Sequence, residues 1–141
     1  MSRIYWDSML FVYWLEDHPH FAKRVGTIHA RMKERGDELI TSAFTFGEVL
    51  AGVYRANAAG AAGESRRLML QVLAEVIPFQ LETSEHYARI RGTTGVAPSD
   101  AIHLACAAQA KTDLFLTNDK QLPGRFVPGI QFIAGLDTPL F

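Results

Sequence analysis

The sequence has one cysteine, no long apolar run and almost no net charge. Cys106 cannot close an intrachain disulfide, and its alanine-rich surroundings predict that it is a buried core residue. Charged residues interrupt each apolar stretch before it could cross a bilayer, and the first residues lack the pattern of a secretory signal. We therefore expect a cytoplasmic protein with no membrane contact.

A large positive charge is also missing. The 14 Lys and Arg residues are balanced by 15 Asp and Glu residues, which gives a formal charge of -1. A protein that holds nucleic acid by bulk electrostatics is expected to be basic. Any such binding here must therefore depend on local Lys and Arg clusters or on a metal ion. Runs such as Arg31, Lys33 and Arg35 are better explained as solvated helix faces.

The length and the pattern of apolar residues predict one domain over residues 1–141, because no repeat or low-complexity linker divides the chain. Strand-like segments alternate with helical patterns, which favours an α/β fold with a parallel sheet. The predicted strands span residues 4–6, 39–41, 76–79, 114–116 and 130–133. The predicted helices span about 8–16, 21–36, 42–53, 66–74, 83–90 and 99–110, with a break over 57–63 and a loop over 92–98.

Four acidic residues stand close to the ends of these elements: Asp7, Glu48, Asp100 and Asp119. Asp7 and Asp119 directly follow predicted strands. Glu48 and Asp100 fall in the predicted first turns of helices. Chemistry in open parallel sheets collects outside the carboxyl ends of the strands, so all four side chains are expected at one edge of the sheet. Gathered carboxylates repel one another, and a bound cation or a catalytic role is the usual reason to gather them.

Each acid also has a purely structural explanation. The motif Thr45-x-x-Glu48 fits a capping box, in which both side chains serve a helix start. Asp100 suits a helix dipole, and Asp119 lies in a turn that favours Asp. Asp7 could simply precede a helix. The arrival of all four at one predicted edge favours a shared site over four separate caps.

The histidines and serines predict no competing site. His18-x-His20 flanks a proline in a turn and lacks the spacing of a zinc site. His103 lies one helical turn beyond Asp100 and could reach the rim of the acidic site, but a structural or surface role is favoured. No serine sits in a G-x-S-x-G elbow, and no glycine loop has the Lys-Ser/Thr of a P-loop.

Four segments of the sequence occur in a specific order: YWDSMLFVYWL (5–15), TSAFTFGEVLAG (41–52), PSDAIHLACA (98–107) and FLTND (115–119). Together they resemble the PIN-domain nucleases, and within these the toxins of VapBC-type toxin–antitoxin pairs. The resemblance covers nearly the whole chain. It implies a three-layer α/β/α sandwich with a central parallel sheet. It also implies an endoribonuclease that depends on Mg²⁺ or Mn²⁺.

The resemblance implies a role for each acid. The catalytic and metal-binding residues would be Asp7, Glu48, Asp100 and Asp119, with Thr117, Asn118 and Ser8 in support. Thr117 and Asn118 would fix the turn and hydrogen-bond the carboxylates. Asp7 and Asp100 would bind the ion directly, Glu48 would be a ligand or would orient a water, and Asp119 would be a ligand or a more distant acid. Mg²⁺ prefers hard oxygen ligands, so this set suits metal-assisted hydrolysis of RNA phosphodiester bonds.

The resemblance also implies protein partners. A VapB-type antitoxin would cover the groove with an apolar segment and direct an Arg or Lys toward the acids. A homodimer is expected too, because toxins of this family usually pair and because an N-terminal aromatic cluster is larger than the first helix should need. Two-fold pairing is also the commonest form of oligomer. The cluster contains Tyr5, Trp6, Phe11, Tyr13 and Trp14.

Two other functions are compatible with the residues. A catalytically inactive PIN-like scaffold could bind protein or RNA, with its acids acting only as caps or as partners of an arginine. A receiver-like domain could carry out phosphoryl transfer. It would normally have an acidic pair after the first strand and a late lysine, whereas here Asp7 stands alone and only Lys120 is near.

Overall fold

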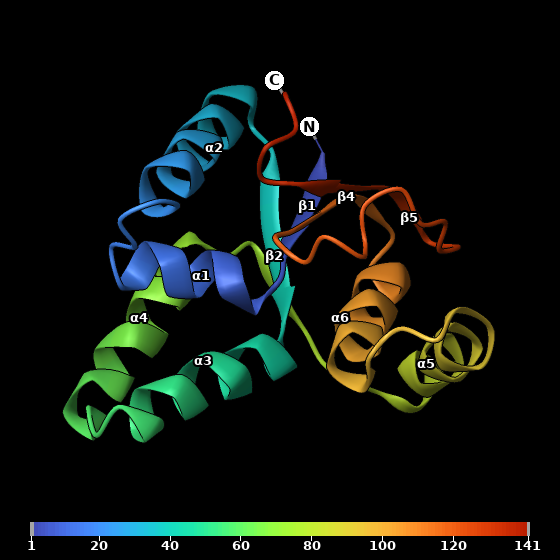
Figure 1. Ribbon diagram of the computed structural model, residues 1–141, viewed down its shortest axis with the longest axis horizontal. Coiled ribbons are helices and arrows are strands. Elements are labelled where there is room, and N and C mark those ends of the chain that lie inside the picture. The colour runs from blue at the N-terminus through green and yellow to red at the C-terminus, as the bar shows by residue number, and fades with distance from the viewer. Residues whose placement is uncertain (1, 141) are drawn as a thin grey trace.

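The computed structural model describes residues 2–140 and contains a five-stranded sheet with helices on both faces (Figure 1). The strands are β1 (Arg3–Trp6), β2 (Glu38–Ser42), β3 (Glu75–Ile77), β4 (Thr112–Thr117) and β5 (Ile130–Gly135). The helices are α1 (Ser8–Leu15), α2 (Ala22–Arg35), α3 (Ala43–Arg55), the short 3-10 turn η1 (Ala59–Ala61), α4 (Ala62–Val72), α5 (Leu81–Thr94) and α6 (Pro98–Gln109). Every helix and strand predicted from the sequence is present. Within the described residues, no helix has both the length and the apolar character to span a membrane.

Strand β1 lies at the centre of the sheet. The strand order is β3-β2-β1-β4-β5, and each neighbouring pair is parallel. The chain builds outward from β1 through β2 and β3, then crosses to β4 and β5 on the other side. The ends of β1 and β4 therefore form a topological switch point, which is where open parallel sheets bind ligands.

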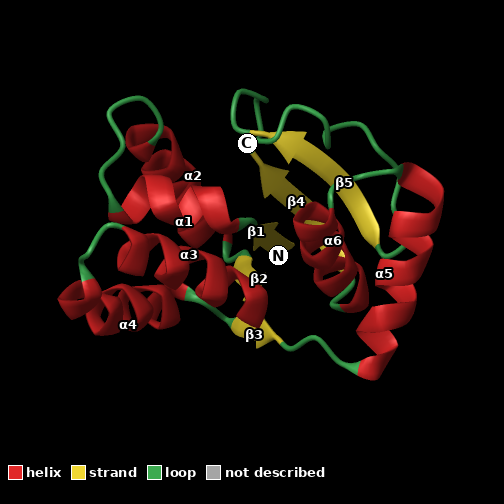
Figure 2. Cartoon of the chain, turned by 60° about the horizontal axis from the view of Figure 1, so that its bottom comes forward, coloured by secondary structure: helices red, strands yellow, loops and turns green. Residues whose placement is uncertain are grey.

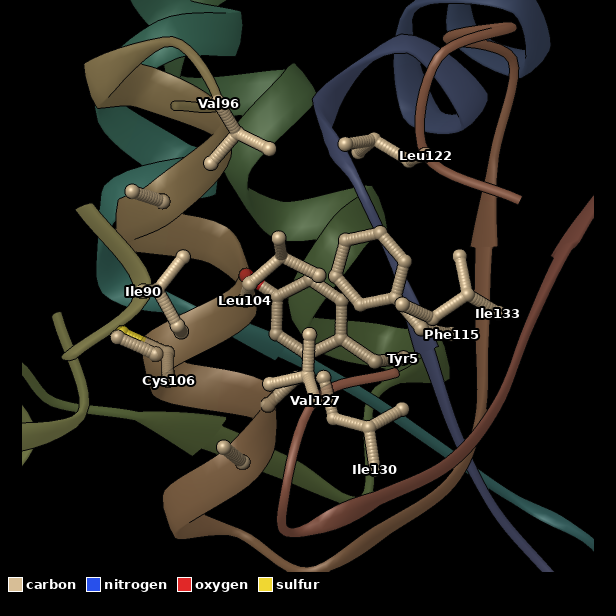
Figure 3. Close-up of a cluster of buried hydrophobic side chains, with 14 of the residues drawn as sticks. Tyr5, Ile90, Val96, Leu104, Cys106, Phe115, Leu122, Val127, Ile130 and Ile133 are labelled. Atoms are coloured by element: carbon tan, nitrogen blue, oxygen red, sulfur yellow. The ribbon is translucent and has the colours of Figure 1, made fainter. Parts of the chain in front are cut away.

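The side chains of β1 alternate between two cores, as the pleat of a strand requires. Ile4 and Trp6 pack with α1, α2, α3 and α4 on one face of the sheet. Tyr5 packs with α5 and α6 on the other face, beside Phe115 of β4 (Figure 3). Figure 2 shows the strands between these two groups of helices. This arrangement confirms the predicted three-layer α/β/α sandwich.

Two predicted boundaries are wrong. Helix α4 begins at Ala62, inside the stretch 57–63 that was predicted to be a break. Alanine is the best helix former, and the short η1 turn absorbs the change of direction. Helix α5 continues through Gly92 into the predicted loop 92–98, because one glycine costs only about 1 kcal/mol in a helix interior. It ends at Gly95, whose φ of 69° is left-handed.

The N-terminal aromatic cluster is buried within the chain itself. Four of its rings are buried and Trp14 is half-buried. Tyr5 belongs to one core, whereas Trp6, Phe11 and Tyr13 belong to the other. The size of the cluster therefore gives no reason to expect a dimer, and that step of the sequence argument is wrong. Cys106 is buried in α6, as predicted.

The chain approaches α6 closely at Gly129, just before the edge strand β5. Gly129 has a φ of 98°, and a Cβ atom built there would lie 2.6 Å from the carbonyl oxygen of Ala108 in α6. The Gly129 carbonyl accepts a hydrogen bond of 3.0 Å from the backbone N–H of Thr112 at the start of β4. Only a residue without a side chain combines this positive φ with so close an approach to α6.

Candidate active site

A cleft of about 890 Å³ lies at the topological switch point. Its walls come from the residues that follow β1 and β4 and from α1, α3 and α6. All four acids predicted from the sequence line it: Asp7, Glu48, Asp100 and Asp119. Two of the predicted supporting residues, Ser8 and Asn118, line it as well, and the third, Thr117, is fully buried beside Asp7. The fold thus brings together residues that are far apart in sequence.

Asp7 is held from two sides. Its Oδ1 accepts a hydrogen bond from the Met9 backbone N–H at 3.2 Å, so Asp7 is the N-cap of α1. Its Oδ2 accepts a hydrogen bond from the Thr117 hydroxyl at 2.5 Å. Burial nevertheless raises the pKa of Asp7, and the bond from Thr117 opposes this only in part. Asp7 therefore combines a capping role with a carboxylate that favours a nearby cation.

The turn after β4 is organised by Thr117. Its hydroxyl oxygen also accepts a hydrogen bond from the Asp119 backbone N–H at 3.0 Å. Asp119 Oδ1 accepts one from the Gln121 backbone N–H at 2.9 Å, so the expected turn role of Asp119 is present too. Asn118 was predicted to hydrogen-bond the acids. That prediction is wrong, because its amide donates to the Tyr13 hydroxyl at 2.9 Å.

Asp100 lies in the first turn of α6 and faces Asp119. Burial of Asp100, then a hydrogen bond shared with Asp119 and the negative charge of Asp119, raise the pKa of Asp100 to about 6. The charge of Asp7 acts in the same direction. A bound cation would relieve the repulsion between these carboxylates.

Glu48 does not form the capping box that was considered from the sequence. The N-cap of α3 is Ser42, which accepts a hydrogen bond from the Thr45 backbone N–H, and Glu48 lies in the second turn of α3. Its Oε1 lies 2.5 Å from the Ser8 hydroxyl and 2.6 Å from His103 Nε2. Burial favours a higher pKa for Glu48, but the hydrogen bonds from His103 and Ser8 outweigh it and lower the pKa.

His103 belongs to the cleft, although the sequence did not assign it to the site. A structural or surface role was favoured, yet the side chain lines the cleft and pairs with Glu48. It is 4% exposed. The signal in the sequence was its spacing of three residues from Asp100, which puts both side chains on one face of α6. That spacing alone does not reveal a partner on another helix.

The donor set fits a hard divalent cation. Asp7, Asp100 and Asp119 supply only carboxylate oxygens, and two of the three have a raised pKa. Among residues 2–140, no three Asp, Glu, His or Cys side chains stand close enough together to form a ready metal cage. Mg²⁺ does not require one, because it keeps several waters and is usually bound by one or two carboxylates. The Asp100–Asp119 pair meets that requirement.

Beyond the acids, the cleft has an apolar wall and one cation. The apolar lining comes mainly from α1 and α3 and includes Met9, Val12, Leu15, Val49, Val53 and Ala56. The cation is Arg55, in the last turn of α3. Its side chain is exposed, and none of the described residues forms an ion pair with it. The cleft is therefore acidic at one end and mostly apolar elsewhere, where its charged lining residues are Arg55 and Glu16.

A parallel α/β/α sandwich with acids gathered at its switch point defines a recognisable class of protein. The chain belongs to the PIN domain family, whose model matches residues 4–124. No sequence among curated proteins matches the chain significantly. The receiver-like alternative has no support, because Lys120 lies 3.7 Å from Asp137 and the family is a different one.

Several solved structures share this fold. VapBC2 from Rickettsia felis, bound to a DNA fragment from its promoter, is similar with a TM-score of 0.76 and 14% identity, covering 94% of this chain and 98% of that chain. FitAcB from Neisseria gonorrhoeae has a TM-score of 0.66 and 22% identity, covering 82% of this chain and 87% of that chain. VapBC-5 from Mycobacterium tuberculosis, of the VapBC family of toxin–antitoxin systems, has a TM-score of 0.61 and 17% identity, covering 94% of this chain and 98% of that chain. Identities this low establish the fold and no more.

Proposed function

We propose that this PIN domain is a metal-dependent endoribonuclease that hydrolyses RNA phosphodiester bonds. The observation that carries the proposal is the group of acids at the switch point, where burial raises the pKa of Asp7, and burial together with the nearby carboxylates of Asp119 and Asp7 raises the pKa of Asp100. A fold stabilised only by caps has no need of a buried Asp near a pair of facing carboxylates. Mg²⁺ is the expected ion, and Mn²⁺ has the same preference for oxygen ligands.

The residues divide the work of hydrolysis. Asp7, Asp100 and Asp119 would hold the ion, which, when bound, supplies a Lewis acid for the phosphodiester and lowers the pKa of a bound water. Glu48, whose hydrogen bonds lower its pKa, is ionised at neutral pH and can orient that water or join the ligands. Thr117 keeps Asp7 in place, and Ser8 keeps Glu48 in place. No nucleophilic side chain is required.

The remainder of the cleft supports an RNA substrate. Because the net charge is -1, attraction to phosphate must be local. Arg55 lies on the same helix as Glu48 and seven residues further on, so it is about 10 Å away along the helix axis. We expect it to contact a backbone phosphate near the one that is cleaved. Arginine binds phosphate with two parallel hydrogen bonds, which suits this role.

We further propose that the protein is the toxin of a VapBC-type pair and is neutralised by a VapB-type antitoxin. Solved VapBC structures share its fold, and the apolar wall of α1 and α3 offers a surface for an apolar antitoxin segment. An Arg or Lys of that segment would pair with the acids and compete with the metal. A short reading frame for a DNA-binding protein beside this gene would support the assignment.

A homodimer is part of the proposal, although the buried aromatic cluster does not argue for it. Its support is the fold shared with VapBC proteins and the general preference of oligomers for two-fold pairing. Exposed aromatic side chains on the described surface, such as Phe126 and Phe132, are candidates for the contact. Light scattering of the purified protein measures this directly. We expect the cytoplasm as the location, where RNA is available.

Cleavage of RNA tests the proposed activity. We expect the purified protein to cut RNA in the presence of Mg²⁺, to stop when EDTA is added, and to resume when Mg²⁺ is restored. Asp100→Asn, prepared in the same way, is the control for a contaminating nuclease and should be inactive. RNA binding without cleavage by the native protein would favour the inactive scaffold instead.

A further inference from the structure

His103 connects the cleft to the centre of the sheet through its two shortest side-chain contacts, and longer ones join Nε2 to Ser8 at 3.2 Å and Nδ1 to Thr45 at 3.5 Å. Its Nε2 lies 2.6 Å from Glu48 Oε1, and its Nδ1 lies 2.8 Å from the Tyr5 hydroxyl. The Tyr5 hydroxyl in turn donates to Ser42 Oγ at 2.8 Å. A histidine that only fills a core needs a satisfied ring, but not a carboxylate at the wall of a cleft. The double pairing therefore indicates a role beyond packing.

Tyr5 holds the inner side of the His103 ring rigidly. Its own ring is fully buried and stacks on Phe115, with the centroids 5.0 Å apart and the planes 8° from parallel (Figure 3). Its backbone belongs to β1, the central strand. On another side, the Phe44 ring meets the His103 ring edge-on at 5.2 Å. His103 therefore has little freedom to rotate, and its Nε2 stays directed at Glu48.

Glu48, by contrast, reaches out of the core. Its side chain is 33% exposed, against 5% for the side chain of His103. Its Oε1 is engaged by His103 and Ser8, whereas no donor among residues 2–140 contacts its Oε2. One oxygen is thus anchored, and the other is available to a water, an ion or a substrate. Without such an anchor, a glutamate on a helix samples several rotamers.

We propose that His103 is a positioning residue that fixes the Glu48 carboxylate at the cleft, and that Tyr5 sets the orientation of the His103 ring. The inference rests on the proposed nuclease function for the role of Glu48. The pairing of the three side chains can be tested without that function. A group already held in its working geometry does not have to be ordered during the reaction, and a misplacement of about 1 Å can cost about 100-fold in rate.

Three substitutions separate positioning from packing, with kcat and KM measured on a short RNA in Mg²⁺. His103→Leu keeps a buried apolar side chain but removes both nitrogens, and we expect kcat to fall about 100-fold while KM changes little. His103→Gln can place an amide N–H near the position of Nε2, and should recover at least about tenfold of that loss. Tyr5→Phe keeps the stacking and removes the shorter contact at Nδ1, while the Thr45 hydroxyl remains 3.5 Å from that nitrogen, so its loss should be intermediate.

A control and a double-mutant cycle complete the kinetic test. His29 is half-buried against Trp14 and does not line the cleft, so His29→Gln should leave kcat unchanged. In a Glu48→Gln background, His103→Leu should cost much less than in the native protein. Equal costs in both backgrounds, or equally slow Leu and Gln variants, would overturn the inference. If melting curves show that His103→Leu does not fold, Tyr5→Phe takes its place in the cycle.

NMR of the ring nitrogens distinguishes a failure of this inference from a failure of the proposed nuclease. In long-range ¹H–¹⁵N spectra, Glu48→Gln should shift His103 Nε2 more than Nδ1, and Tyr5→Phe should do the reverse. An inactive native protein with this signature would overturn the nuclease function and support the pairing. An active native protein whose Nε2 does not respond to Glu48→Gln would overturn the pairing.

Discussion

Thr117 and Asp7 lie 110 residues apart in the chain, and the threonine hydroxyl donates a hydrogen bond of 2.5 Å to the aspartate carboxylate. The bond joins the ends of β4 and β1, next to the pairing of Leu116 with Trp6. The same hydroxyl oxygen accepts from the Asp119 N–H. One buried side chain thus connects two of the proposed metal ligands at the switch point.

Removing that hydroxyl should weaken the site more than the fold. Thr117→Val keeps the shape but leaves the Asp7 oxygen unsatisfied, so we expect a loss of about 1–3 kcal/mol of stability. Metal affinity and cleavage should fall about 10- to 100-fold, as for other groups that support a ligand. Thr117→Ser retains the hydroxyl and is the matched control. Calorimetric titration with Mn²⁺ and an RNA assay measure both effects, and Val and Ser variants of equal activity would contradict the expectation.

Asp7→Asn should abolish cleavage with the fold intact. Asn is as good an N-cap as Asp, so the start of α1 is preserved. The substitution removes a negative charge that would attract the cation, and we expect cleavage to fall about 100-fold or more. Asp119→Asn should behave in the same way. Circular dichroism checks the fold, and a variant that cleaves RNA like the native protein would remove Asp7 from the proposed ligands.

The raised pKa of Asp100 makes the metal-free protein sensitive to pH. The pKa rises from its ordinary 3.8 to about 6, so the folded state holds this proton more tightly than the unfolded chain. The corresponding contribution to stability is complete below about pH 4 and is lost as the pH rises through 6. Asp100→Asn cannot ionise, so its melting temperature should exceed that of the native protein at pH 8 but not at pH 4.

Glu82→Gln is the control for this pH effect, because Glu82 is exposed at the start of α5 and outside the cleft. The melting temperature of Glu82→Gln should not exceed that of the native protein at pH 4 or at pH 8. Thermal melts with EDTA at both values suffice. In the native protein, Mg²⁺ affinity should increase as the pH rises through 6, since Asp100 must ionise to bind the ion. Affinity that is flat between pH 5 and 7 would exclude Asp100 as a ligand.

Arg55→Ala should weaken RNA binding in a way that depends on salt. Losing one phosphate contact should reduce the slope of log Kd against log salt by about 1. Arg66→Ala is the matched control, because Arg66 is also exposed but does not line the cleft. Binding of an RNA to the Asp100→Asn protein, followed at several salt concentrations, gives the slopes. Equal slopes for both variants would place the phosphate contact elsewhere.

Gly129→Ala should destabilise the protein more than Gly124→Ala. Both glycines have positive φ values, so each alanine should cost about 1–2 kcal/mol of backbone strain. At Gly129 the new Cβ would also overlap the Ala108 carbonyl, which should add about 1–3 kcal/mol. Nothing lies within 4 Å of a Cβ at Gly124. Urea unfolding compares the two, and equal midpoints would show that α6 can move aside.

Local sequence patterns predicted most of the helices and strands correctly. They failed at helix boundaries where residues that favour a helix stand beside residues that favour a break. The periodicity of apolar residues located the five strands and the six α-helices of the described chain, because burial of one face imposes it. The boundaries of α4 and α5 were predicted wrongly. A run of alanine and glycine looks like a helix break in a sequence, but these residues cost little free energy within a helix. The aromatic cluster was misread for a related reason. A sequence shows that rings are numerous, but not that Tyr5 and Trp6 point to opposite faces of a buried strand.

The sequence by itself determined that the chain forms a parallel α/β fold and that four acids stand near the ends of its elements. Both follow from short-range physics, namely periodic burial and the positions of caps and turns. Only the tertiary structure decided what those acids contact. Asn118 hydrogen-bonds to Tyr13 instead of the acids, and His103 on α6 hydrogen-bonds to Glu48 on α3. Such pairings depend on how helices and strands dock, because side chains tens of residues apart become neighbours only when the sheet order and the packing of its faces are set.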